Sequence, residues 1–173
     1  RYIDFRKSAY RYPNGNVYEP FYSFSRRDYV VIVASDEDGN YICVRPFRHG
    51  LKQVTTEFPA GGIERSDGKE YGDREGAAEK VIETAKRELL EETGYESDEW
   101  KHLMTIPANA TISDNYASIF VARNCRKTSA QHLDETECLV VEKFSADEIE
   151  ELIRSGRFQQ AIHVLAWLLA KYN

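Results

Sequence analysis

The sequence predicts an α/β fold: an α/β/α sandwich built on a mixed sheet, with an N-terminal β-hairpin arm. Short runs rich in Val, Ile, Phe and Tyr recur along the chain, and turn residues separate them. A charged amphipathic helix interrupts these runs near residues 79–93, and two further helices follow the last run. The 173 residues are enough for one domain with a sizeable core, to which the hairpin is an addition.

The first 27 residues are predicted to form the arm, and residues 28–173 the main domain. Tyr2–Tyr10 and Val17–Phe24 read as strands around the turn Pro13-Asn14-Gly15-Asn16. The hairpin is too rich in Tyr and Phe to remain fully in water. A dimer surface is the first interpretation, and a cover for a nucleobase or a simple edge hairpin are the alternatives.

Five strands and two more helices follow from the patterns of the main domain. The predicted strands are Asp28–Ser35, Tyr41–Arg45, Glu99–Ile106, Tyr116–Ala122 and Cys138–Phe144. Ser145 and Glu148 have the spacing of a capping box, so a helix is expected from there to Arg154, with Gly156 as its stop. Phe158–Lys171 is predicted as the last amphipathic helix.

The helix before Gly94 carries the most informative residues of the chain. Glu88, Glu91 and Glu92 fall within about 100° of arc on a helix, so they share one face. An adjacent apolar stripe is formed by Ala78, Ile82, Ala85 and Leu89. Arg87 offsets part of the repulsion among the acids, and a divalent cation would offset far more. An ordinary solvated face is the alternative, but the register, core stripe and glycine stop occur together here.

The run from Glu79 to Gly94 resembles the Nudix box, Gly-x5-Glu-x7-Arg-Glu-U-x-Glu-Glu-x-Gly-U, where U is aliphatic. Tyr95 stands at the last aliphatic position. The leading glycine corresponds to Gly61. Seventeen residues separate it from Glu79, where the box has five, which implies an insertion in loop 63–78. Loops accept such insertions at small thermodynamic cost. The resemblance implies the Nudix fold.

Upstream motifs are similar to those of the ADP-ribose pyrophosphatase branch of this family. They are Val44-Arg45-Pro46-Phe47-Arg48 and Glu57-Phe58-Pro59-Ala60-Gly61. The proline that often follows the box in this branch is shifted here, to Pro107. The resemblance implies Mg²⁺-dependent hydrolysis of ADP-ribose to AMP and ribose 5-phosphate, with Mn²⁺ as an alternative cation. Hydrolysis of another nucleotide sugar such as GDP-mannose, or a non-catalytic nucleotide-sensing module, are the alternatives.

The resemblance also implies roles for individual residues. Glu88 and Glu92, followed by Glu91, would be metal ligands together with the backbone carbonyl of Ala60, and Arg87 would orient the acids. Glu57 would lie near the substrate or the outer metal shell. Arg45 and Arg48 would bind the diphosphate through forked donors, although solvated strand-end charges are nearly as good an interpretation of either one.

Hydrolysis also needs a carboxylate that takes a proton from the attacking water. Three glutamates are candidates for this general base. In the resembling branch the base comes from an acidic loop ahead of a strand, which favours Glu137 and Glu135 over Glu79. A solvated acidic turn is an equally simple explanation of this loop.

Composition restricts the partners. The net charge is −6, and no basic face of the kind that binds nucleic acid is visible. Cys43 and Cys138 lie in apolar runs and are expected to be buried, and an odd count of three cysteines favours a reducing cytoplasm. Ala161–Ala170 is too short to span a membrane. Composition thus favours a cytoplasmic protein that binds neither nucleic acid nor membrane. The hairpin adds the expectation of a homodimer, and the resemblance implies a small nucleotide as substrate.

Overall fold

The computed structural model describes residues 3–64, 77–134 and 138–172, and for residues 77–80 only the backbone. Most of the predicted insertion, as well as Glu135 and Glu137, lies outside these residues. The elements of the main domain are β3 (Tyr29–Asp36), β4 (Tyr41–Arg48), β5 (Gln53–Val54), β6 (Ala60–Gly62), α1 (Ala77–Thr93), β7 (Tyr95–Glu96), β8 (Glu99–Pro107), β9 (Tyr116–Lys127), β10 (Leu139–Phe144), α2 (Ala146–Arg154) and α3 (Ala161–Lys171).

These strands form an eight-stranded sheet with the order β10-β4-β3-β9-β7, to which β5, β6 and β8 add through β4, β3 and β9. The central strands β3 and β9 run parallel, whereas the other described strand pairs are antiparallel. The predicted mixed sheet is therefore confirmed.

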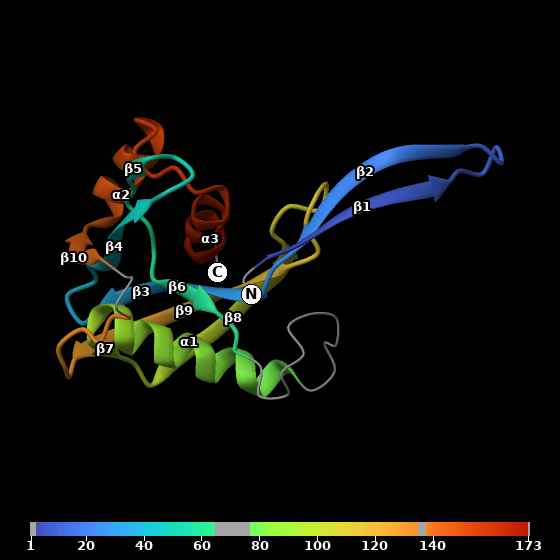
Figure 1. The fold of residues 1–173 in the computed structure, drawn as a ribbon. Helices are drawn as coiled ribbons and strands as arrows, with labels where there is room; N and C mark the ends of the chain where they lie inside the picture. Colours follow the sequence, from blue (N-terminus) through green and yellow to red (C-terminus); the bar gives the residue numbers. More distant parts are fainter. Residues whose placement is uncertain (1–2, 65–76, 135–137, 173) are drawn as a thin grey trace.

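Alternation along β3 explains why helices cover both faces of the sheet. Val30, Ile32 and Ala34 pack in one core cluster with Ala85 and Leu89 of α1. The intervening residues belong to a second cluster with α2 and α3, whose buried members include Val31, Val33, Ile149, Ala166 and Trp167. Figure 1 shows α1 on one side of the sheet and α3 on the other. The α/β/α sandwich follows from this two-sided burial.

The N-terminal hairpin consists of β1 (Asp4–Arg11) and β2 (Val17–Ser25), which pair in a separate two-stranded sheet. It projects away from the main sheet (Figure 1). Its base is held by Asp114, whose carboxylate accepts hydrogen bonds from the Arg6 guanidinium at 2.8 Å and the Ser25 hydroxyl at 2.5 Å.

Helix ends follow the local signals. Gly94 and Gly156 have φ angles of 76° and 72°, in the left-handed region that glycine adopts readily. Ser145 and Glu148 form the predicted capping box at the start of α2. In α1, Ala85 and Leu89 are buried and Ile82 is partly buried against the same core, as the apolar stripe predicted. The side chain of Ala78 is outside the described part.

Several details of the sequence prediction were wrong. The strands β4 and β9 extend to Arg48 and Lys127, beyond the predicted ends at Arg45 and Ala122. The last helix begins at Ala161 and not at Phe158, because Gln160 is extended and the Phe158 ring packs edge-on against Phe58. Cys138 is exposed, since it precedes β10 instead of lying within it. The strands β5, β6 and β7 were not predicted, because two or three residues are too few to show a period.

Candidate active site

The site is organised around the extended segment Glu57–Gly62, which passes from β4 to β3. Glu57 exchanges two backbone hydrogen bonds with Val44, at 2.8 and 3.0 Å, and the Pro59 carbonyl accepts the Ile32 N–H at 2.9 Å. Pro59 has no N–H, so this position leaves no donor to be satisfied. The segment then continues as β6, antiparallel to β3. It is thereby fixed between the two strands.

Gly61 lets a carboxylate of α1 lie directly against this segment. A Cβ at position 61 would be 1.9 Å from the Glu88 carboxylate carbon and 2.1 Å from both of its oxygens. At the next position the nearest atom to a new Cβ would be Arg27 Cδ, at an unstrained 3.9 Å. Glycine is thus required at position 61 by the approach of Glu88, and not by its backbone conformation.

The predicted acids lie beside Gly61 along α1. Arg87 donates to Glu88 at 2.6 Å and to Glu91 at 2.5 Å. Burial disfavours the charged form of Arg87, but these two carboxylates raise its pKa above the ordinary value. Glu92 is only 8% exposed, and its carboxylate accepts the Ala60 N–H at 3.0 Å. The structure therefore brings together Glu88, Glu91, Glu92, Arg87 and Ala60, which the sequence had assigned to one site.

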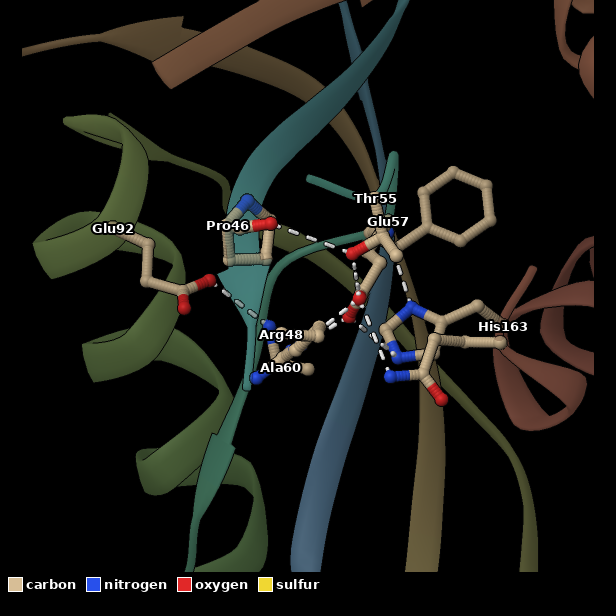
Figure 2. Close-up of polar contacts among 9 residues, drawn as sticks. Pro46, Arg48, Thr55, Glu57, Ala60, Glu92 and His163 are labelled. Carbon is tan, nitrogen blue, oxygen red and sulfur yellow. Dashed lines mark hydrogen bonds and ion pairs between the residues drawn. The ribbon is translucent and has the colours of Figure 1, made fainter. Parts of the chain in front are cut away.

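Glu57 is fully buried on the other side of the same segment (Figure 2). Arg48 binds it with a two-pronged contact, Nε to Oε1 at 2.9 Å and Nη2 to Oε2 at 2.6 Å. The Thr55 hydroxyl and the Gln160 amide also donate to Oε1, at 2.5 and 3.3 Å. Burial alone would raise the pKa of Glu57, but the hydrogen bonds from Arg48 and Thr55 lower it below the ordinary value. Glu57 is therefore ionised and enclosed.

His163 of α3 completes this buried cluster. Its Nδ1 accepts the Phe58 N–H at 3.1 Å, while its Nε2 lies 3.7 Å from Glu57 Oε2. Burial lowers the pKa of His163 to about 4, against the opposing effect of Glu57. The imidazole is therefore neutral near pH 7. No local sequence pattern marks this role of His163, because its partners Phe58 and Glu57 are about a hundred positions away in the chain.

The loop that leads to Glu135 and Glu137 is tied to the end of α1. The Gln131 side-chain amide donates to the Glu92 carbonyl at 2.7 Å, and the His132 N–H donates to the Glu91 carbonyl at 2.8 Å. Position 132 is thus attached directly to the acidic helix. Both loop glutamates lie outside the described residues.

The remaining predicted residues are placed less centrally. Arg45 pairs with Glu142 of β10 at 3.0 Å, and both side chains are more than a third exposed. Its described partner therefore differs from that of Arg48. Glu79 lies in the first turn of α1. Glu88 follows nine positions later, which is about 13 Å along the helix axis.

The donor chemistry of the α1 face fits a hard divalent cation. Three carboxylates within five consecutive positions, next to a backbone segment that offers carbonyl oxygens, are the ligand types that Mg²⁺ and Mn²⁺ take. Among the described residues, no group of three His, Cys, Asp or Glu side chains is already arranged as a ligand set. Arg87 donates to Glu88 and Glu91, and the Ala60 N–H donates to Glu92, so these contacts orient the three acids.

The fold and the site define the class of protein. The family model described as NUDIX domain matches residues 25–168, and the chain therefore belongs to the Nudix family. This places it among the Nudix hydrolases, enzymes that generally use a divalent metal ion.

The chain is also similar in sequence to individual proteins of known name. The chain is 28% identical over 133 residues to an ADP-ribose pyrophosphatase of Bacillus subtilis (strain 168), covering 76% of this chain and 65% of that protein. It is 27% identical over 138 residues to a methanol dehydrogenase activator of Bacillus methanolicus, covering 79% and 68%. An ADP-ribose pyrophosphatase of Mycobacterium tuberculosis (strain ATCC 25618 / H37Rv) shares 31% identity over 98 residues, covering 57% and 42%. The matches thus span about two thirds or less of these relatives.

The crystal structure of an ADP compounds hydrolase has the same fold. It superposes with a TM-score of 0.80 at 23% identity, covering 99% of this chain and 86% of the other. In the described part of the chain no helix is long and apolar enough to cross a membrane.

Proposed function

We propose that this protein hydrolyses the diphosphate of ADP-ribose, giving AMP and ribose 5-phosphate, with Mg²⁺ or alternatively Mn²⁺. The observation that carries the proposal is the contact between the acids of α1 and the segment Ala60–Gly61. The Glu88 carboxylate lies against Gly61, and the Glu92 carboxylate accepts the Ala60 N–H, so two carboxylates lie beside one backbone segment that is held in place. The relatives named ADP-ribose pyrophosphatase support the choice of substrate.

Glu88, Glu92 and Glu91, with the carbonyl of Ala60, would hold the cation. A bound divalent ion neutralises phosphoryl oxygens and lowers the pKa of water. Arg87 holds Glu88 and Glu91 in place through its two hydrogen bonds. Because it is already shared between two acids, its role is to orient them and to balance part of their charge.

The attacking water needs a carboxylate that accepts its proton, and we place this general base at Glu137 or Glu135. The attachment of Gln131 and His132 to the end of α1 supports this choice, because it ties their loop to the acidic helix. Glu79 is the weaker candidate, since it lies about 13 Å along the helix from Glu88.

Arg45 and Arg48 would bind the diphosphate, each through a planar group with several donors. Arg48 is held by its two-pronged contact with Glu57, so its guanidinium is oriented before substrate arrives. Glu57 therefore acts on the substrate through Arg48. Arg45 would exchange its exposed pairing with Glu142 for phosphate oxygens.

The test is a hydrolysis screen with the products identified by mass spectrometry. ADP-ribose and GDP-mannose are each incubated with Mg²⁺, with Mn²⁺ and with a chelator. The proposal predicts AMP and ribose 5-phosphate from ADP-ribose in the metal-containing samples only. Faster cleavage of GDP-mannose would assign the other substrate. Binding of ADP-ribose without turnover under every condition would indicate the sensing module.

We further propose that residues 1–27 act as an arm that joins two copies of the chain around the domain 28–173. Isolated two-stranded sheets are marginal in water. This hairpin nevertheless exposes large apolar side chains on both strands, among them Phe5, Tyr10, Val17 and Tyr22. A second copy would cover them. The three cysteines are free, which supports a cytoplasmic location.

A further inference from the structure

The segment Phe58–Ala60 is held by one side chain from each of the two helix layers. On one side, His163 of α3 accepts the Phe58 N–H at 3.1 Å. On the other, Glu92 of α1 accepts the Ala60 N–H at 3.0 Å. Only Pro59 lies between Phe58 and Ala60, and its carbonyl accepts a hydrogen bond from the Ile32 N–H of β3. The position of Ala60 relative to the acids of α1 therefore depends on both helices (Figure 2).

The chemistry of His163 suits the acceptor role specifically. The ring is 4% exposed and neutral near pH 7, because burial lowers its pKa to about 4. With the Nδ1 lone pair used for Phe58, the ring proton resides on Nε2, which faces the ionised Glu57 carboxylate at 3.7 Å. Glu57 thus favours the tautomer that leaves Nδ1 as an acceptor. Gln160, at the start of α3, contacts the same carboxylate at 3.3 Å and fixes the helix beside it.

We propose that His163 is a positioning residue for the metal site: its Nδ1 holds the Phe58 N–H and so sets the place of Ala60 against Glu92. The inference rests on the proposed function for its catalytic consequence, but its consequence for metal affinity is independent of the substrate. By this proposal, α3 helps to position the backbone beside the acids of α1, although α3 is remote from them in sequence and carries none of them. No sequence motif of the acidic helix indicates this part.

Two substitutions separate the acceptor from the packing of the ring. His163→Asn places an amide oxygen where Nδ1 lies, with less volume. His163→Phe fills the volume and removes the acceptor. Because displacements of about 1 Å near an active site can lower activity about 10²-fold, we expect His163→Phe to lose between about tenfold and a hundredfold in Mn²⁺ affinity and in kcat. We expect His163→Asn to stay within a few-fold of wild type. Exposed His102, changed to Phe, is the matched control.

Two readouts do not require turnover. Calorimetric titration gives the Kd for Mn²⁺ alone, and amide hydrogen exchange reports protection at Phe58 and Ala60. If the protein cleaves none of the screened nucleotides, the proposed function fails while these readouts still test the role of His163. A role in packing alone predicts the opposite order, with the Phe variant better than the Asn variant. Wild-type affinity and protection in His163→Phe, or equal losses in both variants, would overturn the proposal. If His163→Phe does not fold, His163→Leu takes its place.

Discussion

Replacing Gly61 by Ala tests the contact between α1 and the segment beside it. The new methyl group would lie 1.9 Å from the Glu88 carboxylate carbon, whereas ordinary contact begins near 3.4 Å. The carboxylate must therefore retreat by about 1.5 Å. It can do so, because it is the end of a flexible side chain. The backbone at position 61 also accepts Ala, since it is not in the left-handed region. The fold should survive, while the geometry of the acids should not.

The expected magnitude follows from that displacement. Misplacing a catalytic group by about 1 Å can cost about 10²-fold, so Gly61→Ala should lower kcat/KM for ADP-ribose by about that factor. The melting temperature should change by only a few degrees, since the clash is relieved locally. Gly62→Ala is the matched control in the same strand, because its methyl group would be 3.9 Å from its nearest neighbour and should cost little.

A double-mutant cycle shows whether the loss passes through Glu88. In a Glu88→Ala background the new methyl group has no carboxylate to displace, so Gly61→Ala should cost almost nothing further. Equal activity of the Gly61→Ala and Gly62→Ala enzymes would refute the reasoning. So would a Gly61→Ala penalty that is unchanged when Glu88 is absent.

Three further predictions concern acid stability, the arm and the base. The pKa of His163 is about 4 in the folded protein and 6.5 in the unfolded chain, so the unfolded chain takes up the proton first as the pH falls. The contribution of neutral His163 to the free energy of unfolding is therefore fully present above pH 6.5, and about 3 kcal/mol of it should be lost towards pH 4. Urea titrations should show a smaller loss in His163→Asn than in wild type, and equal losses would contradict this. Deleting residues 1–24 should lower both the oligomer mass and the substrate affinity, and a full-length protein that is monomeric in light scattering at micromolar concentration would contradict the dimer. Either Glu137→Gln or Glu135→Gln, whichever removes the base, should lower kcat by about 10²–10⁴-fold at nearly unchanged KM and Mg²⁺ affinity. Glu79→Gln should instead disturb the metal dependence. If both loop variants keep the wild-type kcat while Glu79→Gln loses it at unchanged Mg²⁺ affinity, the base lies in α1.

Local sequence patterns predicted the parts of this structure that depend on local physics. The apolar stripe of α1, its glycine stop and the capping box of α2 each lie within a few residues of chain, and the structure confirms them. Gly61 and Glu88 were assigned to one motif from the sequence, but their contact was not predicted. Its physical reason, a glycine without which the carboxylate could not approach, is visible only in three dimensions.

The cluster of side chains around Glu57 could not be predicted from the sequence. Its members Arg48, Gln160 and His163 are scattered along the chain, and their interaction depends on α3 packing beside the segment after β4. The sequence indicated that Glu57 lies near the substrate or the outer metal shell. The structure shows it fully buried and bound to Arg48. A charged residue at a strand end gives no local signal that distinguishes a buried ion pair from a solvated group.

The most direct test of the account is Mn²⁺ binding, followed by electron paramagnetic resonance, in Glu92→Gln and in Glu83→Gln. The amide introduced by Glu92→Gln would retain an oxygen acceptor for the Ala60 N–H but lack the charge that a hard cation needs. Glu83 lies on the same helix, 65% exposed and paired with Lys86, outside the predicted face. The account predicts that Glu92→Gln folds but loses Mn²⁺ affinity and turnover by orders of magnitude, whereas Glu83→Gln matches wild type. Near-normal turnover of Glu92→Gln at saturating Mg²⁺ would contradict it.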